Sequence, residues 1–453
     1  MSTPAATNLI VSPGKPLVGD VHLPGDKSIS HRLALLAALA DGKSEIRNFL
    51  VAGVTQVMLD ALAALGLSYE IDQSTLTIHG HGQGGLRTPE RPIDCGNSAT
   101  TMRLLAGFLA ALGIPAILDG SPGLRRRPMG RIIAPLQAMG VPIQGTPAAT
   151  APLILGARPL GQKLRPLDYT LPVASAQVKS ALLLASLAAA GPCTLREPGQ
   201  TRDHTERLLE SLGIKIKTSE QNGEFHQSSR EITLEPPDTL SFDPISLSVP
   251  GDISSAAFLM VGASIAAGSD IRIFDCGLNP TRTGVIDALQ SMGANIILSG
   301  EYQEHGEASG NVRVRSGRLK GISVAGPLVV RMIDEFPAFT AAAAFATGET
   351  CISNAEELRQ KESDRITSLC EEFNHLGANI IEHPDGFVLT GRPLTGGRVQ
   401  AHGDHRLAMA LAIAGLAAGA PVTVIGAETI HESYPGFVKD LQRLGAAVTV
   451  EGV

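Results

Sequence analysis

The fold is decided by residues 95–113, CGNSATTMRLLAGFLAALG, together with the helix ending LQAMG at residues 136–140. After Arg103 the first segment is apolar on every side, which predicts a helix that is buried all round. The second segment ends an amphipathic helix with glycine, which is typical of a left-handed helix C-terminus. Short β-prone runs follow such helices, so the repeating unit is two helices with three to four strands.

The same helix ending recurs along the whole chain. Its form is Leu-x-x-Leu/Met-Gly, loosely kept, and the copies close at Gly66, Gly140, Gly213, Gly293, Gly377 and Gly445. A far more apolar helix precedes each copy. One such match would mean little, because the pattern is common at helix ends, but six in phase indicate an internal repeat.

Six units in 453 residues predict an α/β protein with two domains of three repeats each. The polar stretch at residues 218–244 is the natural boundary between the third and fourth repeats. The expected domains are therefore residues 23–243 and residues 244–453, the second joined by residues 1–22, because the first strand can belong with the C-terminal half.

Composition narrows the class of protein. A net charge of −7 argues against a nucleic-acid partner. Five dispersed cysteines and the lack of a signal peptide favour the cytoplasm. The uncharged run Leu407–Ala427 is interrupted by Gly419 and Pro421, so we expect a short helix and a strand rather than a membrane span. Motifs for nucleotides, metals or a nucleophilic serine are absent from the sequence, which favours metal-free transfer chemistry.

Polar motifs precede all six apolar helices. They are PGDKSISHR, CGNSATTMR, ASAQVKS, PGDISSA, MIDEFPA and HGDHR. Serine, aspartate and asparagine are ordinary N-cap residues, so capping explains any one of them. Helix N-termini also attract anions, and four of the six motifs carry Lys or Arg, which suits a substrate with several phosphates or carboxylates.

Arginine-rich segments point to the same ligands. They are residues 124–131, 201–207 and 359–365, and each alone could equally be a solvated surface. The last one places Glu362 among cations, and Asp334 lies in an otherwise apolar segment. An acid among cations suits general acid–base catalysis, although Asp334 could instead be a helix cap.

Seven of these strings, in this order, resemble the EPSP synthases, the 3-phosphoshikimate 1-carboxyvinyltransferases. The strings are LPGDKSISHR, CGNSATTMRL, LRRRPMGR, ASAQVKSALLLA, GDISSAAF, LRQKESDR and GDHRLAMA, and the resemblance, which is to the class II branch, runs from about residue 12 to 450. It implies the two-domain inside-out α/β barrel of the enolpyruvyl transferase fold, with six βαβαββ-type repeats and the active site in the cleft between the domains.

The implied reaction transfers the enolpyruvyl group of phosphoenolpyruvate to the 5-hydroxyl of shikimate 3-phosphate and releases phosphate, in a monomer without cofactor or metal. Asp334 is implied as base, Glu362 as acid and Lys27 as a further catalytic residue. Matching motifs assign the shikimate 3-phosphate contacts to Lys27, Ser28, Arg32, Ser175, Gln177, Arg202, Asp334 and Lys361. They assign the phosphoenolpyruvate contacts to Lys27, Ala99, Arg127, Gln177, Arg365 and Arg406.

Three departures from the family pattern matter. Ala99 stands where many members have glycine, and its methyl group predicts tolerance of glyphosate, which is slightly longer than phosphoenolpyruvate. The loop at residues 48–56 lacks an acid that most members carry, and Glu432 and Ser433 replace a class I lysine segment, so no ligand role is assigned at either place.

Two alternatives remain. UDP-N-acetylglucosamine enolpyruvyl transferases share the fold, but they have Lys-Asn where this chain has Lys27-Ser28, and a reactive cysteine where the loop at residues 121–130 has none. A catalytically inactive anion-binding homologue is the other, and the retained Lys27, Asp334, Glu362 and Arg406 count against it.

Overall fold

The computed structural model describes residues 7–159, 161–222 and 228–452. The chain forms two compact units, which are described separately below. The N-terminal lobe comprises residues 25–249 and 304–307, and the C-terminal lobe comprises residues up to Pro24, 250–303 and those from Ala308 on. The division after Val249 lies later than the expected boundary at 243, because the polar stretch forms a hairpin of the N-terminal lobe and one more strand of that lobe follows it.

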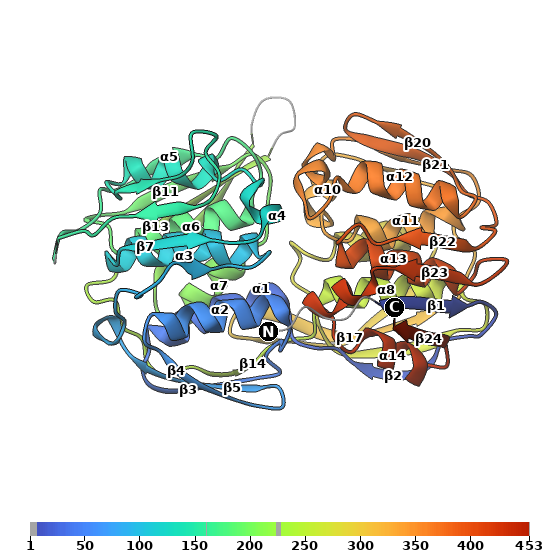
Figure 1. Ribbon diagram of the computed structural model, residues 1–453, viewed down its shortest axis with the longest axis horizontal. Coiled ribbons are helices and arrows are strands. Elements are labelled where there is room, and N and C mark those ends of the chain that lie inside the picture. Colours follow the sequence, from blue (N-terminus) through green and yellow to red (C-terminus); the bar gives the residue numbers. More distant parts are fainter. Residues whose placement is uncertain (1–6, 160, 223–227, 453) are drawn as a thin grey trace. The chain divides into compact units, whose positions relative to one another are not determined.

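The N-terminal lobe consists of three four-stranded sheets and their helices (Figure 1). In sheet order the strands are β14 (Ser246–Ser248), β3 (Asp41–Arg47), β5 (Thr75–His81) and β4 (Ser68–Asp72); β6 (Ile93–Asp94), β7 (Ala116–Asp119), β9 (Leu153–Leu155) and β8 (Ile143–Gln144); and β10 (Asp168–Thr170), β11 (Cys193–Glu197), β13 (Ser228–Glu235) and β12 (Lys215–Asn222). The inner helices are α1 (Lys27–Ala38), α3 (Ala99–Leu112) and α6 (Ala176–Ser186), and the amphipathic ones are α2 (Gly53–Ala64), α5 (Gly130–Ala138) and α7 (His204–Ser211).

The C-terminal lobe repeats this plan. Its sheets are β16 (Asn295–Glu304), β17 (Glu307–Arg315), β15 (Asp270–Gly277) and β2 (Val18–His22); β18 (Ser323–Val324), β19 (Glu349–Ile352), β21 (Gly386–Thr390) and β20 (Asn379–His383); and β22 (Gly397–Gln400), β23 (Val422–Ile425), β1 (Thr7–Ser12) and β24 (Ala447–Gly452). The inner helices are α8 (Ile253–Ile265), α11 (Phe336–Ala344) and α13 (His405–Gly415), and the amphipathic ones are α9 (Gly284–Ser291), α12 (Arg365–His375) and α14 (Phe437–Arg443).

Distant strands complete the sheets of both lobes. The first strand, β1, pairs antiparallel with β23 and β24, which confirms that it belongs with the C-terminal half. The next strand, β2, pairs parallel with β15. In exchange, β14 from the end of the third repeat pairs parallel with β3. Strands from the chain segments that connect the lobes therefore close one sheet in each.

The six apolar helices are buried, as predicted. In α3, the consecutive residues Leu104, Leu105, Ala106 and Gly107 are all buried, and successive residues are about 100° apart around the helix, so every side of it is covered. Helices α3 and α6 run side by side inside the N-terminal lobe, and α11 and α13 do so inside the C-terminal lobe (Figure 1). The apolar run from Leu407 divides into α13 and β23, as expected. Among the described residues, no helix is long and apolar enough to cross a membrane.

All six repeat glycines adopt the left-handed conformation, with φ from +86° at Gly213 to +101° at Gly445. After each glycine the next N–H donates to a carbonyl five residues back, as Val141 does to Leu136 at 3.0 Å. This is the Schellman arrangement, which turns the chain from the amphipathic helix into a strand. In four repeats a side-chain amide on the helix also binds a carbonyl six residues later, as Gln137 binds Ile143 at 2.7 Å.

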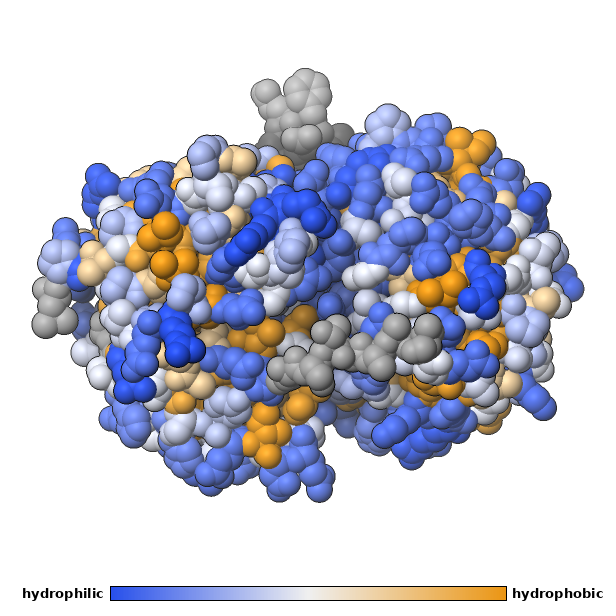
Figure 2. Space-filling model, viewed as in Figure 1, coloured by the Kyte–Doolittle hydropathy of each residue, from blue (hydrophilic) through white to orange (hydrophobic). Residues whose placement is uncertain are grey.

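On the face shown in Figure 2, hydrophilic side chains predominate and apolar ones form small separate groups. The exposed large apolar residues include Ile297, Ile381 and Val450, each on a terminal strand of a different sheet. Single exposed apolar residues are normal on protein surfaces, so these need no functional explanation.

Close packing of α3 on α6 predicts that Gly107→Ala destabilises the protein. A Cβ atom at Gly107 would lie 2.0 Å from the carbonyl oxygen of Ala181 on α6. We expect a loss of about 1–3 kcal/mol of unfolding free energy, seen as a lower melting temperature in calorimetry. Gly262→Ala on α8 is the matched control, because its Cβ atom would meet only side-chain methyl groups at 3.1–3.2 Å. Equal melting temperatures for the two variants would contradict the prediction.

Candidate active-site residues

In five of the six polar motifs that precede the inner helices, one side chain caps the helix N-terminus. The caps are Asp26, Ser98, Ser175, Asp252 and Asp404, and each accepts a hydrogen bond from a backbone N–H in the first turn. The capping interpretation is therefore confirmed for these five residues. The sixth inner helix, α11, starts at Glu335 without a side-chain cap bond. Because these caps already accept hydrogen bonds from backbone N–H groups of the first turn, any contact to a ligand depends mainly on the neighbouring side chains.

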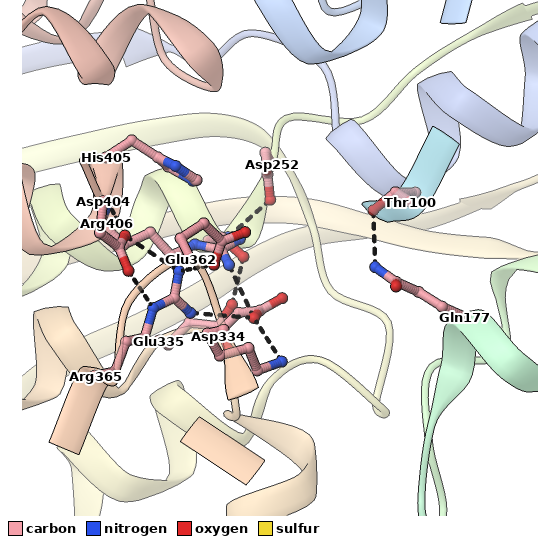
Figure 3. A network of polar contacts seen from close by, with 12 residues as sticks. Thr100, Gln177, Asp252, Asp334, Glu335, Glu362, Arg365, Asp404, His405 and Arg406 are labelled. Carbon is pink, nitrogen blue, oxygen red and sulfur yellow. Dashed lines mark hydrogen bonds and ion pairs between the residues drawn. The ribbon is translucent and has the colours of Figure 1, made fainter. Parts of the chain in front are cut away.

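In the C-terminal lobe, Asp334 is surrounded by cations. Its Oδ1 lies 2.8 Å from Nη1 of Arg406, 3.4 Å from Nζ of Lys361 and 3.5 Å from Nη1 of Arg365 (Figure 3). These residues come from the start of α13, the segment before α12 and the first residue of α12. Asp334 itself precedes α11, so the sequence-predicted acid and three predicted cations meet at the start of these helices.

Arg365 links the carboxylates of this group. Its Nε lies 2.7 Å from Oδ2 of Asp404, and its Nη2 donates to Glu362 at 2.6 Å (Figure 3). Burial alone would lower the pKa of the Arg365 guanidinium, but Asp404, Glu362 and Asp334 outweigh it and raise that pKa. Burial would likewise raise the pKa of the Asp404 carboxyl, but Arg365 holds it below its ordinary value. Both side chains are therefore charged at neutral pH.

Arg359 fixes the segment that carries Lys361 and Glu362. Its Nη1 donates to Oδ2 of Asp364, the α12 cap, at 2.8 Å. Its Nε and Nη2 donate to the carbonyl oxygens of Pro384 and His383 at 2.8 and 2.7 Å. The segment is thus tied to the hairpin of β20 and β21, which explains how an irregular stretch holds two predicted site residues in place.

A second buried polar group in this lobe lies between the starts of α8 and α11. Arg282 Nη2 lies 2.8 Å from Oγ of Ser254, 3.3 Å from Oδ1 of Asp252 and 3.7 Å from Oε1 of Glu335. Ser254 in turn donates to Glu335, the neighbour of Asp334. Sequence reasoning missed Arg282 and Glu335, because an isolated Arg in a loop and an acid beside another acid give no local signal.

In the N-terminal lobe, Arg32 is buried in the second turn of α1. Its Nε donates to Thr205 at 2.6 Å, its Nη2 to Ser180 at 2.6 Å and its Nη1 to the carbonyl oxygen of Ser28 at 2.9 Å. Burial lowers the pKa of Arg32 to about 10, which leaves it charged at neutral pH. Arg32 therefore joins α1 to α6 and α7, and the predicted Ser28 lies one turn before it.

Gln177 joins the starts of α3 and α6. Its Nε2 donates to Thr100 at 2.8 Å (Figure 3), and its Oε1 accepts from Arg103. Ala99, the first residue of α3, precedes Thr100 and is 3% exposed. The predicted Ala99 and Gln177 thus lie at neighbouring helix starts.

The remaining predicted residues are partly exposed or cap a helix. Lys27 is the first residue of α1, and Ser175 caps α6, where its Oγ accepts from Val178 at 3.5 Å. Arg127 lies between α4 (Pro122–Arg125) and α5, and Arg202 lies between β11 and α7. Lys27, Arg127 and Arg202 are all half-buried.

Comparison with known proteins gives one consistent result. The family model for EPSP synthase (3-phosphoshikimate 1-carboxyvinyltransferase) matches residues 11–441. A 3-phosphoshikimate 1-carboxyvinyltransferase of Halorhodospira halophila is 47% identical over 98% of both chains, and that of Alkalilimnicola ehrlichii is 46% identical over 97% of this chain and 96% of its own. The EPSP synthase structure from Acinetobacter baumannii aligns with a TM-score of 0.85 at 39% identity, over 98% of this chain and 100% of that one.

A more distant structure shows the fold alone. The enolpyruvyl transferase NikO from Streptomyces tendae aligns with a TM-score of 0.78 at 20% identity, over 99% of this chain and 100% of its own. The six-repeat enolpyruvyl transferase fold that the sequence predicted is therefore confirmed by solved structures as well as by the architecture of each lobe.

His31, beside Arg32 on α1, predicts a pH-dependent stability. Its Nδ1 lies 2.8 Å from the carbonyl oxygen of Lys27 and its Nε2 3.1 Å from that of Val54. Burial, supported by the charges of Lys27 and Arg32, lowers the pKa of His31 from 6.5 to about 4. Between these values the unfolded chain binds a proton that the folded chain does not, so stability falls as pH decreases.

We expect the wild type to lose about 2 kcal/mol more than His31→Gln between pH 7.5 and pH 5. Calorimetric melting at both pH values measures this difference. His383→Gln is the control, because His383 is exposed on β20. Parallel pH profiles for the wild type and His31→Gln would contradict the prediction.

Proposed function

The chain belongs to the EPSP synthase family, and we propose which of its residues carry out each step of the family's reaction. The protein transfers the enolpyruvyl group of phosphoenolpyruvate to the 5-hydroxyl of shikimate 3-phosphate, giving 5-enolpyruvylshikimate 3-phosphate and phosphate. It is a transferase of the shikimate pathway. One observation supports the proposed residue roles: the carboxylate of Asp334 faces the cations Lys361, Arg365 and Arg406. Glu362 accepts a hydrogen bond from the same Arg365.

In the addition step, Asp334 takes the proton from the 5-hydroxyl while the oxygen attacks C2 of phosphoenolpyruvate. Glu362 gives a proton to the methylene carbon, which becomes a methyl group. Protonation makes C2 cationic and deprotonation strengthens the nucleophile, so the two transfers assist each other. In the elimination step, the methyl group returns its proton to Glu362 and the bond from C2 to the phosphate oxygen breaks. The vinyl ether is restored, and phosphate leaves with the proton that Asp334 had taken from the hydroxyl.

Arg365 and Arg406 are suited to the anionic groups of phosphoenolpyruvate. Both are buried guanidinium groups, and such forks bind carboxylate and phosphate strongly when water is excluded. Arg365 already donates to Glu362 at 2.6 Å. A substrate anion that binds this same edge of Arg365 would compete with Glu362 for it, which would release the carboxyl group for proton transfer. The other proposed contacts to phosphoenolpyruvate are Lys27, Ala99, Arg127 and Gln177.

Shikimate 3-phosphate calls for a second group of donors. The proposed set is Lys27, Ser28, Arg32, Ser175, Gln177 and Arg202, with Asp334 and Lys361 near the reacting hydroxyl. Arg32 has five N–H groups and donates three hydrogen bonds to other protein groups, so it can also donate to a ligand.

All five cysteines are free, which fits a reducing compartment, so we place the enzyme in the cytoplasm. We further propose that it acts as a monomer.

Neutral isosteres at the two acids test the assignment. We expect Asp334→Asn and Glu362→Gln each to lower kcat by about 10²–10⁴-fold, because proton transfer by a positioned side chain contributes that much. Phosphate release from shikimate 3-phosphate and phosphoenolpyruvate, with a chelator present, measures the effect. Glu371→Gln is the control, because Glu371 is exposed on α12. A kcat within about threefold of wild type in either variant would reject its role, and a wild-type protein without turnover would be an inactive homologue.

Replacing Ala99 tests the proposed tolerance of glyphosate. The buried methyl group at the first position of α3 takes up space next to the bound phosphoenolpyruvate in the proposed site. We expect Ala99→Gly to bind glyphosate at least about tenfold more tightly than the wild type, since a clash of one methyl group has this order of effect. Inhibition constants measured against phosphoenolpyruvate give the answer. Ala110→Gly, near the other end of α3, controls for the helix, and equal inhibition of wild type and Ala99→Gly would contradict the prediction.

A further inference from the structure

A buried ion group occupies the interior of the N-terminal lobe. Nζ of Lys179 on α6 lies 2.8 Å from Oε1 of Glu206 and 3.1 Å from Oε1 of Glu197. Lys179 and Glu197 are 0% exposed and Glu206 is 2% exposed. Placing three charges in a protein interior is costly unless each one has partners, so the group requires an explanation beyond packing.

Glu197 connects this group to the segment that carries Arg202. It is the last residue of β11, and its Oε2 accepts from the hydroxyl of Thr201 at 2.6 Å. Its Oε1, which faces Lys179, also lies 3.3 Å from the backbone nitrogen of Thr201, which donates to it. One carboxylate therefore accepts hydrogen bonds from Lys179 and from both the backbone N–H and the hydroxyl of Thr201. Arg202 is the next residue, so its backbone position depends on this contact.

Glu206 connects the same lysine to α7. It lies in the first turn of α7, directly after Thr205. The Thr205 hydroxyl donates to Ser180 at 2.7 Å and accepts from Arg32 at 2.6 Å. Ser180 follows Lys179 on α6, so adjacent residues of α6 hold adjacent residues of α7. Lys179 is thus the cation between the two acids that fix the segment from Thr201 to Glu206 at both ends.

The charges explain why a cation is needed at this position. Burial alone would lower the pKa of Lys179, but Glu206 and Glu197 outweigh it and raise that pKa. Lys179 is therefore charged at neutral pH. Burial raises the pKa of Glu197, and Lys179 opposes this effect. Without Lys179, two buried carboxylates would face each other, and the cheapest response would be for one to move or take up a proton.

We propose that Lys179 is a positioning residue for substrate binding: through Glu197 and Glu206 it holds the segment that presents Arg202 to shikimate 3-phosphate. The inference rests on the proposed role of Arg202. Lys179 itself is fully buried and touches no ligand in this scheme. Its loss should therefore weaken binding of shikimate 3-phosphate while leaving phosphoenolpyruvate binding and the chemical step nearly intact.

A double-mutant cycle tests this inference. Lys179→Met, Arg202→Gln and the double variant are compared with wild type for kcat and for KM of each substrate. We expect Lys179→Met to raise KM for shikimate 3-phosphate by about tenfold or more, with kcat and KM for phosphoenolpyruvate within about threefold. In the Arg202→Gln background, Lys179→Met should add less than about twofold, because coupled residues are not additive. Lys179→Arg keeps the charge and should restore most of the affinity.

Two controls separate positioning from a general loss of stability. Leu183→Ala removes a fully buried apolar side chain from the same helix and leaves all three charges in place, and it should not change KM selectively. Should Lys179→Met not fold, Lys179→Met/Glu206→Gln replaces it throughout the cycle, since this pair removes one buried charge of each sign.

The outcomes distinguish the two proposals. Additive effects in the cycle, with Arg202→Gln impaired, would overturn the role of Lys179 alone. Equal changes in both KM values, matched by Leu183→Ala, would also overturn it, because they indicate loss of folded protein. A wild-type KM for shikimate 3-phosphate in Arg202→Gln would overturn the assignment of Arg202 and, with it, the positioning role of Lys179.

Discussion

A helix enclosed by sheets can meet a ligand only at its ends, and this constraint governs both lobes. The inner helices α1, α3 and α6, and likewise α8, α11 and α13, have no face in solvent. Contacts near their N-terminal ends link the three helices within each lobe, through Arg32 and Gln177 in one and through Arg282, Arg365 and Asp334 in the other. Several of the proposed site residues, including Lys27, Ala99 and Gln177, lie at the helix starts for this reason.

The charges around Arg365 in the C-terminal lobe are balanced within their own group. Asp334, Glu362 and Asp404 face Lys361, Arg365 and Arg406, so the carboxylates and the cations of this group are equal in number. Arg365 is shared by all three acids. Each carboxylate of this group therefore has a cation as its partner, which lowers the cost of burying it.

Local patterns in the sequence predicted the six repeats and the two lobes, and the family resemblance supplied the enolpyruvyl transferase fold. The glycine after each amphipathic helix is a local requirement of the left-handed turn, and all six positions were predicted from the sequence. The expected boundary at residue 243 lies slightly before the observed division after Val249, because polarity alone does not distinguish a surface hairpin such as β12–β13 from a linker. For the site, motifs pointed to Asp334, Arg365 and Arg406 together. The sequence did not reveal Lys179, because its partners Glu197 and Glu206 are brought to it only by the tertiary fold.

The chain passes from one lobe to the other after Pro24 and after Val249, and the strands next to these points pair with strands far away in the sequence. This pairing has a consequence for how the chain is made. Apart from the residues at 304–307, the N-terminal lobe is one continuous segment, so a ribosome releases nearly all of it before any later sequence is needed. The C-terminal lobe begins with β1 and β2, whose partners β15, β23 and β24 are synthesised only after the other lobe. During translation these two strands must remain unpaired, with exposed edges that invite wrong pairing. The lobe that holds Asp334 and Glu362 is therefore completed last, when β24 emerges to pair with β1.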